Sequence, residues 1–331
     1  MPSRSRLRGA INPANQPARR RRIVLFILAF LTSTRRASDL LCHASAPWPS
    51  MPDLGKGSSM RNALLAAVLA ALPASALADQ SRPIVDAHIH YSHDTWSVLP
   101  PPEAIKVLRQ AGVKKAFVSS SSDDGTQMLY RAAPDLIVPV LRPYRQRGEL
   151  STWFRDPSII PHVESRLKVN TYAGIGEFHV FGADADLPVV RRMVELAKER
   201  KIFLHAHSDV DAVERIFKQD PDARVLWAHS GFDRPDNVRA LLAKHKMLWA
   251  DLAYRNDYAP GGRLDAPWKQ LILDFPDRFM VGTDTPSPER WYYVVEHAKF
   301  SRTWIAELPA HIGDNVAFRN AERLASWALG Q

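Results

Sequence analysis

The sequence predicts an α/β fold of the (β/α)8 TIM-barrel class, formed as a single domain by residues 79–331 after a cleavable leader. Short apolar runs alternate with amphipathic helical patterns along this segment, which is typical of a parallel sheet built from strand and helix pairs. The apolar runs are continuous rather than alternating, as in strands that helices cover. The length of the segment is close to the ~250 residues that such barrels usually need.

Eight apolar runs are the expected strands: 83–90, 114–121, 135–142, 173–180, 201–208, 223–230, 247–254 and 278–285. Amphipathic helical patterns occupy 101–112, 187–201, 209–219 and 234–246. The segment 143–172 is longer than a minimal strand-to-helix connection, so we expect it to add a helix or a lid. An open doubly wound sheet is disfavoured, because it needs only five or six strands and no G-x-G-x-x-G turn follows the first strand.

The amino-terminal part of the chain reads as a leader. Residues 60–78 combine one positive charge, an apolar run and an A-x-A ending, which is the pattern of a signal peptide cleaved after Ala78. We therefore expect an exported chain, periplasmic or secreted, with no stable membrane insertion after cleavage. Because signal peptides act at the extreme amino terminus, residues 1–59 are expected to be a spurious or disordered upstream segment.

The basic character of the chain belongs to the leader. The formal net charge is +9, yet residues 1–78 hold eleven of the 44 Lys and Arg and two of the 35 Asp and Glu. Residues 79–331 therefore carry 33 of each sign, and this balance argues against a nucleic-acid partner. Cys42, the single cysteine, also lies in the leader, which excludes disulfides, thiolate zinc ligands and a cysteine nucleophile from the barrel.

Polar side chains stand at the carboxyl ends of five expected strands, where barrel enzymes carry their active sites. In chain order they are His88, His90, Glu177, His205, His207, His229 and Asp284. An ordinary hydrogen-bonded histidine pair or a salt-bridged glutamate would account for any one of them alone. Five strand ends that all carry nitrogen or oxygen ligands instead indicate a metal site at the barrel mouth. Imidazole and carboxylate without thiolate suit Zn²⁺, Mn²⁺, Fe²⁺ or Co²⁺.

The motifs VDAHIH, GIGEFHV, LHAHSD, LWAHSGF and VGTDTP, in this order and spacing, resemble those of the amidohydrolase superfamily of metal-dependent TIM-barrel hydrolases. The resemblance runs from about Pro83 to Leu329. Residues 312–329 also resemble the helix that closes those domains. The combined motif is specific, whereas any single piece of it is not.

The resemblance implies a centre of one or two divalent metal ions, with zinc favoured. The implied ligands are His88, His90, Glu177, His207, His229 and Asp284. The resemblance favours a position for Glu177 between two metal ions, in contact with both. Of the two histidines in LHAHSD, His207 is the preferred ligand because a serine follows it, and His205 is expected deeper in the barrel.

The implied activity is hydrolysis of a C–O or C–N bond in a small ester, lactone or amide by metal-activated water. Asp284 would act as acid and base, and His229 would help to stabilise the tetrahedral intermediate. Arg142 and Arg255 are the expected anchors of a substrate carboxylate, with an ordinary ion pair, for example to Asp251, as the alternative for each.

Three other functions remain open at this point. A decarboxylase or hydratase of the same family would use similar ligands on a carboxylated substrate. A TatD-type nuclease would share the Glu and His ligands but needs positive charge for the phosphate backbone. A barrel without catalysis would lack some of the expected ligand positions, and all six are filled here.

Overall fold

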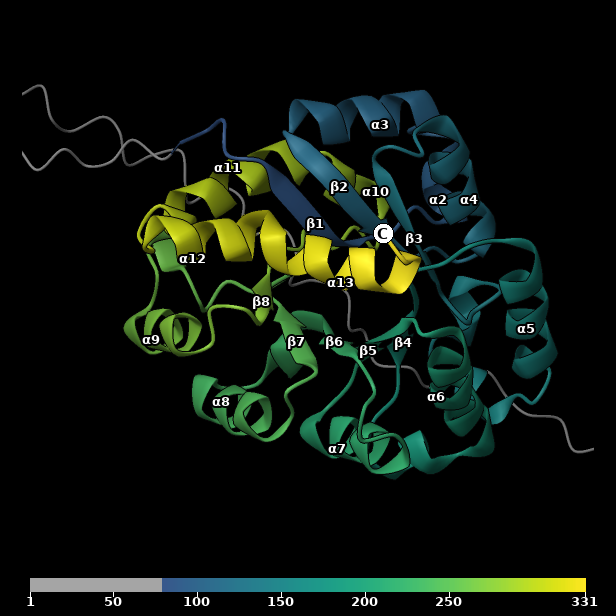
Figure 1. Ribbon diagram of the computed structural model, residues 1–331. Helices are drawn as coiled ribbons and strands as arrows, with labels where there is room; N and C mark the ends of the chain where they lie inside the picture. The colour runs from purple at the N-terminus through teal and green to yellow at the C-terminus, as the bar shows by residue number, and fades with distance from the viewer. Residues whose placement is uncertain (1–78) are drawn as a thin grey trace, which may run out of the picture. The chain divides into compact units, whose positions relative to one another are not determined.

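The computed structural model describes residues 79–331 and shows a barrel of eight parallel strands (Figure 1). The two leader segments expected at 1–59 and 60–78 lie outside the described residues. The strands are β1 (Ile84–Ile89), β2 (Val113–Val118), β3 (Ile137–Leu141), β4 (Gly174–His179), β5 (Phe203–His207), β6 (Val225–Trp227), β7 (Leu248–Asp251) and β8 (Phe279–Met280). Each lies within, or one residue from, a range that the sequence predicts.

Each strand pairs with the next one along the chain, and the segment that follows β8 meets β1 to complete the ring. Two backbone hydrogen bonds join them: the Ala87 amide donates to the Val281 carbonyl (2.8 Å), and the Asp284 amide donates to the His88 carbonyl (2.8 Å). The (β/α)8 fold predicted from the sequence is thereby confirmed. The second bond also fixes Asp284 beside His88.

Helices surround the strands in the expected alternation. They are α2 (His93–Trp96), α3 (Pro101–Gln110), α4 (Asp123–Ala132), α5 (Ile159–Val169), α6 (Pro188–Arg200), α7 (Val210–Gln219), α8 (Pro235–Lys244), α9 (Ala266–Asp274), α10 (Pro288–Trp291), α11 (Val294–Ile305), α12 (Ala310–Asp314) and α13 (Asn320–Leu329). The segment 143–172 adds two single 3₁₀ turns and α5. Among the described residues, no helix is long and apolar enough to cross a membrane.

Helix α13 closes the amino-terminal end of the barrel; Figure 1 shows it lying across the strands. Leu324 and Ala325 of this helix join an apolar cluster inside the barrel with Val85, Phe117 and Phe203. The lower half of the barrel is therefore a packed apolar core, and polar side chains occupy only the opposite, carboxyl end.

Substituting Leu324 with alanine tests this closure. The side chain is 1% exposed, so the cavity left behind should lower the free energy of unfolding by about 2–5 kcal/mol in a urea titration. Val169→Ala, on a side chain that is 74% exposed at the end of α5, is the control and should stay within about 0.5 kcal/mol of the wild type. Equal effects of the two substitutions would contradict a core sealed by α13.

Candidate metal centre

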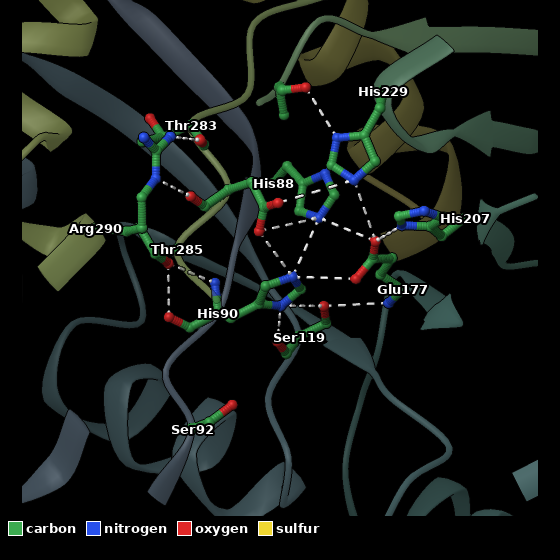
Figure 2. A network of polar contacts seen from close by, with 12 residues as sticks. His88, His90, Ser92, Ser119, Glu177, His207, His229, Thr283, Thr285 and Arg290 are labelled. Atoms are coloured by element: carbon green, nitrogen blue, oxygen red, sulfur yellow. Dashed lines mark hydrogen bonds and ion pairs between the residues drawn. The ribbon is translucent and has the colours of Figure 1, made fainter. Parts of the chain in front are cut away.

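Side chains from the ends of β1, β4, β5 and β6 point toward one another at the mouth of the barrel (Figure 2). They are those of His88, His90, Glu177, His207 and His229. His90 Nε2 lies 3.2 Å from His88 Nε2 and 3.1 Å from Glu177 Oε2. Asp284 Oδ1 lies 3.3 Å from His90 Nε2 and 3.8 Å from His88 Nε2. His229 Nε2 lies 3.4 Å from Glu177 Oε1 and 3.8 Å from Asp284 Oδ2. Ligand atoms that share one ion at about 2.0–2.2 Å have separations of this size.

Glu177 lies between the strand-1 histidines and the strand-5 and strand-6 histidines. Its Oε2 faces His90, and its Oε1 contacts His207 Nδ1 at 2.8 Å. The Arg142 guanidinium holds the same carboxylate: Nη2 donates to Oε2 (2.6 Å), and Nε donates to the Glu177 carbonyl (3.0 Å). Oε1 also lies 3.6 Å from His88 Nε2, so the carboxylate is in reach of histidines from β1, β5 and β6.

Three of the histidines share one hydrogen-bonding arrangement. Each has its Nδ1 against an oxygen that can only accept, so the Nδ1 carries the proton and donates it. In the neutral form of each ring, Nε2 then presents a lone pair to the centre. The acceptors are Asp251 Oδ2 for His88 (3.1 Å), the Ser119 carbonyl for His90 (2.5 Å) and the Ala253 carbonyl for His229 (2.9 Å).

This donor set fits a divalent metal ion. When the three rings are neutral, their Nε2 lone pairs and the carboxylate oxygens face one another, and Asp284 Oδ1 is buried without a hydrogen-bond partner. A buried acceptor left in that state is costly unless a cation satisfies it. Imidazole nitrogens and carboxylates are ligands of Zn²⁺, Mn²⁺, Fe²⁺ and Co²⁺, so the residues present suit the ions expected from the sequence.

The two carboxyl groups of the centre are held in the ionised form. Burial alone would raise both pKa values, but the surrounding positive groups outweigh it. His88 and His90 lower the pKa of Asp284 to about 2. His179, His88 and Arg142 hold the pKa of Glu177 well below its ordinary value. Both groups are therefore ready to bind a cation or accept a proton at neutral pH.

Local backbone geometry aims these side chains. His229 and Asp284 both have φ of +57°, in the left-handed region that residues with a Cβ seldom adopt. Such strained positions persist only where the surroundings enforce them, and they gather at functional sites. Gly176, with φ of +138°, precedes Glu177, and a Cβ there would lie 2.1 Å from the His205 carbonyl oxygen. Only glycine allows β4 to approach β5 this closely beside the ligand.

Asp251, at the end of β7, lies beneath the centre and connects three histidines by hydrogen bonds. It accepts from His88 Nδ1 (3.1 Å), from His205 Nε2 (3.2 Å) and from the His229 amide (2.8 Å). His205 thus lies beneath the centre, against Asp251, while His207 lies beside Glu177. Sequence reasoning considered Asp251 only as a partner for an arginine; a carboxylate inside the apolar run MLWADLAY was the available signal.

The two arginines predicted as substrate anchors occupy different places. Arg142 lines the cavity of the site and is paired with Glu177. Arg255 is not among the lining residues. Its guanidinium donates to the His229 carbonyl (2.9 Å), the Asp233 carbonyl (2.8 Å) and the Asp257 carboxylate (2.6 Å). Arg255 therefore braces the turn that carries His229.

A small cavity of about 100 Å³ opens directly onto the centre. Besides the ligands, its walls include Ser92, Ser121, Tyr144 and Arg147. The Ser121 hydroxyl is buried and has no hydrogen-bond partner, so it is free to bind a ligand there. Sequence reasoning missed Ser121 and also Ser119, whose carbonyl orients His90, because serines after a strand carry no distinctive pattern.

Replacing Asp251 with asparagine tests the support beneath the centre. The amide cannot hold His88 and His205 as a carboxylate does, so zinc affinity in a chelator-competition titration should fall about 10–100-fold. Asp220→Asn removes another buried carboxylate, one that pairs with Lys198, and should leave zinc affinity unchanged. Unchanged zinc affinity in a folded Asp251→Asn protein, judged by circular dichroism, would rule out this positioning role.

The fold is shared with solved barrel structures, although no protein-family model and no curated protein matches the chain. A TIM-barrel protein from Bordetella bronchiseptica is 13% identical, with 75% of this chain and all of that chain covered at a TM-score of 0.52. A provisionally named 2-pyrone-4,6-dicarboxylic acid hydrolase from Pseudomonas putida is 14% identical, with 74% and 97% covered at a TM-score of 0.51. At these identities the likeness shows the TIM-barrel fold alone.

Proposed function

We propose that the chain is a metal-dependent hydrolase of the amidohydrolase type that cleaves a C–O or C–N bond in a small ester, lactone or amide. One observation carries the proposal. Three histidine Nε2 atoms and the carboxylates of Glu177 and Asp284 converge on a single buried centre. The cavity of about 100 Å³ above this centre limits the reacting group to a small one.

The proposed ligands are the strand-1 histidines, Glu177, His207, His229 and Asp284. A bound divalent ion supplies two things, a lowered pKa of a bound water and polarisation of the substrate carbonyl. Because the two oxygens of Glu177 face different histidines, at 3.1 Å for His90 and 2.8 Å for His207, we favour two ions with Glu177 shared between them.

Asp284 is the proposed acid and base. Its pKa of about 2 keeps it ionised, and the unpartnered Oδ1 gives it a lone pair to accept the proton of the attacking water. The same carboxyl then returns that proton to the leaving oxygen or nitrogen, so no net proton is gained or lost at Asp284.

His229 is a proposed metal ligand, because its Nδ1 donates to the Ala253 carbonyl and its Nε2 faces the centre. The further role expected from the resemblance, stabilisation of the tetrahedral intermediate, stays a prediction. Arg142 keeps Glu177 charged and in place.

Asp284→Asn tests the reaction. Because the variant also alters one proposed ligand, it is assayed at saturating zinc, and it should lose about 10²–10⁴-fold in kcat on a panel of small esters, lactones and amides, since the amide accepts no proton. Asp220→Asn is the matched control and should keep wild-type rates. Zinc-loaded wild-type protein with no hydrolysis across the panel, or an Asp284→Asn variant of unchanged rate, would contradict the proposal; release of carbon dioxide from carboxylated substrates would favour the decarboxylase instead.

We further propose that the activity is exercised outside the cytoplasm, because residues 60–78 have the pattern of a signal peptide. Amino-terminal sequencing of the exported chain should begin at Asp79. A chain recovered entirely in the cytoplasm, or one that begins well away from Asp79, would contradict the predicted cleavage.

A further inference from the structure

The cavity over the metal centre is too small for a whole substrate. Its volume is about 100 Å³. A cavity that accepts benzene alone measures about 150 Å³. The pit therefore holds the reacting carbonyl and a few neighbouring atoms, and any larger part of the substrate must lie against the rim.

Several large apolar side chains are exposed on the face of the barrel that carries the site. The large hydrophobic side chains that remain exposed among residues 79–331 are Val98, Leu150, Val169, Phe181, Phe232, Met247, Tyr254, Tyr292 and Tyr293. Six of these follow the carboxyl ends of β3, β4, β6, β7 and β8. Single exposed apolar side chains are ordinary on a protein surface, so the ones of interest are those that contact the histidines of the centre.

Three of them, Phe181, Phe232 and Tyr254, contact the histidines of the centre directly; we call them the aromatic rim. Phe232 stacks on His229 with ring centroids 4.5 Å apart and an interplanar angle of 17°. Phe181 meets His207 edge-on at 5.9 Å, and Tyr254 meets His229 at 6.4 Å. The three side chains are 50–51% exposed, so half of each remains available to a ligand.

Two of these rings stand on backbone in a strained conformation. Phe232 has φ of +53° and Tyr254 has φ of +58°, a conformation that is rare for bulky residues. The lining of the cavity itself is mostly polar, with Arg147, the unpartnered Ser121 hydroxyl and Tyr144, and the aromatic rim lies outside this lining. An apolar group of the substrate that extends beyond the cavity therefore has the aromatic rim as a contact surface.

We propose that the aromatic rim is a specificity subsite for an aryl group attached next to the bond that is hydrolysed. The inference rests on the proposed function, since it takes the metal centre as the place where that bond lies. One face of the Phe232 ring is covered by His229, so an aryl ring would contact the part of Phe232 that remains exposed, with Phe181 beside His207 and Tyr254 beside His229 as further aromatic contacts. Offset or edge-to-face contacts of this kind favour an aromatic ring over a saturated ring of similar size.

Binding of two unreactive ketones tests the subsite without requiring turnover. Phenylacetone and cyclohexylacetone differ only in the planarity and π-system of the ring, and their dissociation constants are measured by calorimetry on the zinc-loaded protein. We expect phenylacetone to bind several-fold more tightly. Phe232→Ala should weaken phenylacetone binding about 5–20-fold and remove the preference, while Phe232→Leu keeps apolar contact but not the preference.

Two measurements keep the result interpretable. Zinc content must stay at the wild-type level in both Phe232 variants, which shows that the stacked His229 is undisturbed. Alanine at position 232 suffers no more from the positive φ than phenylalanine does, so the fold should survive. Val169→Ala, on an exposed side chain at the end of α5 that is not among the six on the face of the site, is the control and should leave both ketone affinities unchanged.

The outcomes separate this inference from the proposed function. Equal affinity for the two ketones, or no effect of Phe232→Ala, overturns the aryl subsite even if esters are hydrolysed. A preference for phenylacetone that depends on Phe232 supports the subsite even if no ester on the panel is turned over, which would count against the hydrolase alone. A dimer in sedimentation experiments that Phe232→Ala dissociates would assign the aromatic rim to a second copy of the chain and overturn the proposal.

Discussion

The arrangement of the barrel mouth depends on one constraint, the need to compensate negative charge and lone pairs that are buried together. Glu177, Asp284 and Asp251 are all ionised and almost entirely buried. Arg142, which pairs with Glu177, supplies a permanent positive charge beside them. A buried carboxylate without a partner is far more costly than any single apolar contact can offset. Protonated histidine compensates part of this charge, and a divalent cation satisfies several of the facing acceptors at once.

Each layer of the barrel helps to shield or to position these buried charges. The apolar cluster sealed by α13 fills the amino-terminal half, so water does not reach the centre from below. Asp251 forms the next layer and fixes the proton on His88 Nδ1. The ligand atoms lie above it, and the positive-φ turns at His229 and Asp284 aim two of them inward. The apolar core that stabilises the barrel thus lies at its amino-terminal end, and the candidate site lies at its carboxyl end.

This division of the barrel into an apolar end and a polar end explains which features could be predicted from the sequence. The eight strands and their polar carboxyl ends are readable because a charged residue in an apolar run is conspicuous. His207 and Glu177 are thirty positions apart, yet both follow predicted strands that are neighbours in a barrel, so their proximity could be anticipated. The depth of His205 was expected for the same reason, since two residues on one face of a strand lie at different heights.

Other features depend on contacts that no local pattern encodes. Arg255 follows a predicted strand just as Arg142 does, but the left-handed turn at His229 places carbonyl oxygens within its reach, so it braces a loop instead of facing the cavity. Asp251 gains its role from two histidines on other strands. The aromatic rim stands on loops, where side-chain direction follows from backbone conformation, and single exposed aromatics in a sequence resemble ordinary surface residues.

The most direct test of the account is a crystal structure of the zinc-loaded protein with anomalous data at the zinc edge. The account predicts one peak within about 2.0–2.2 Å of His88 Nε2, His90 Nε2 and an Asp284 oxygen, and a second beside His207 and His229, with Glu177 contacting both. A zinc-exposed crystal with no peak in the cavity, or with zinc only at surface residues, would contradict the metal centre and the hydrolase built on it.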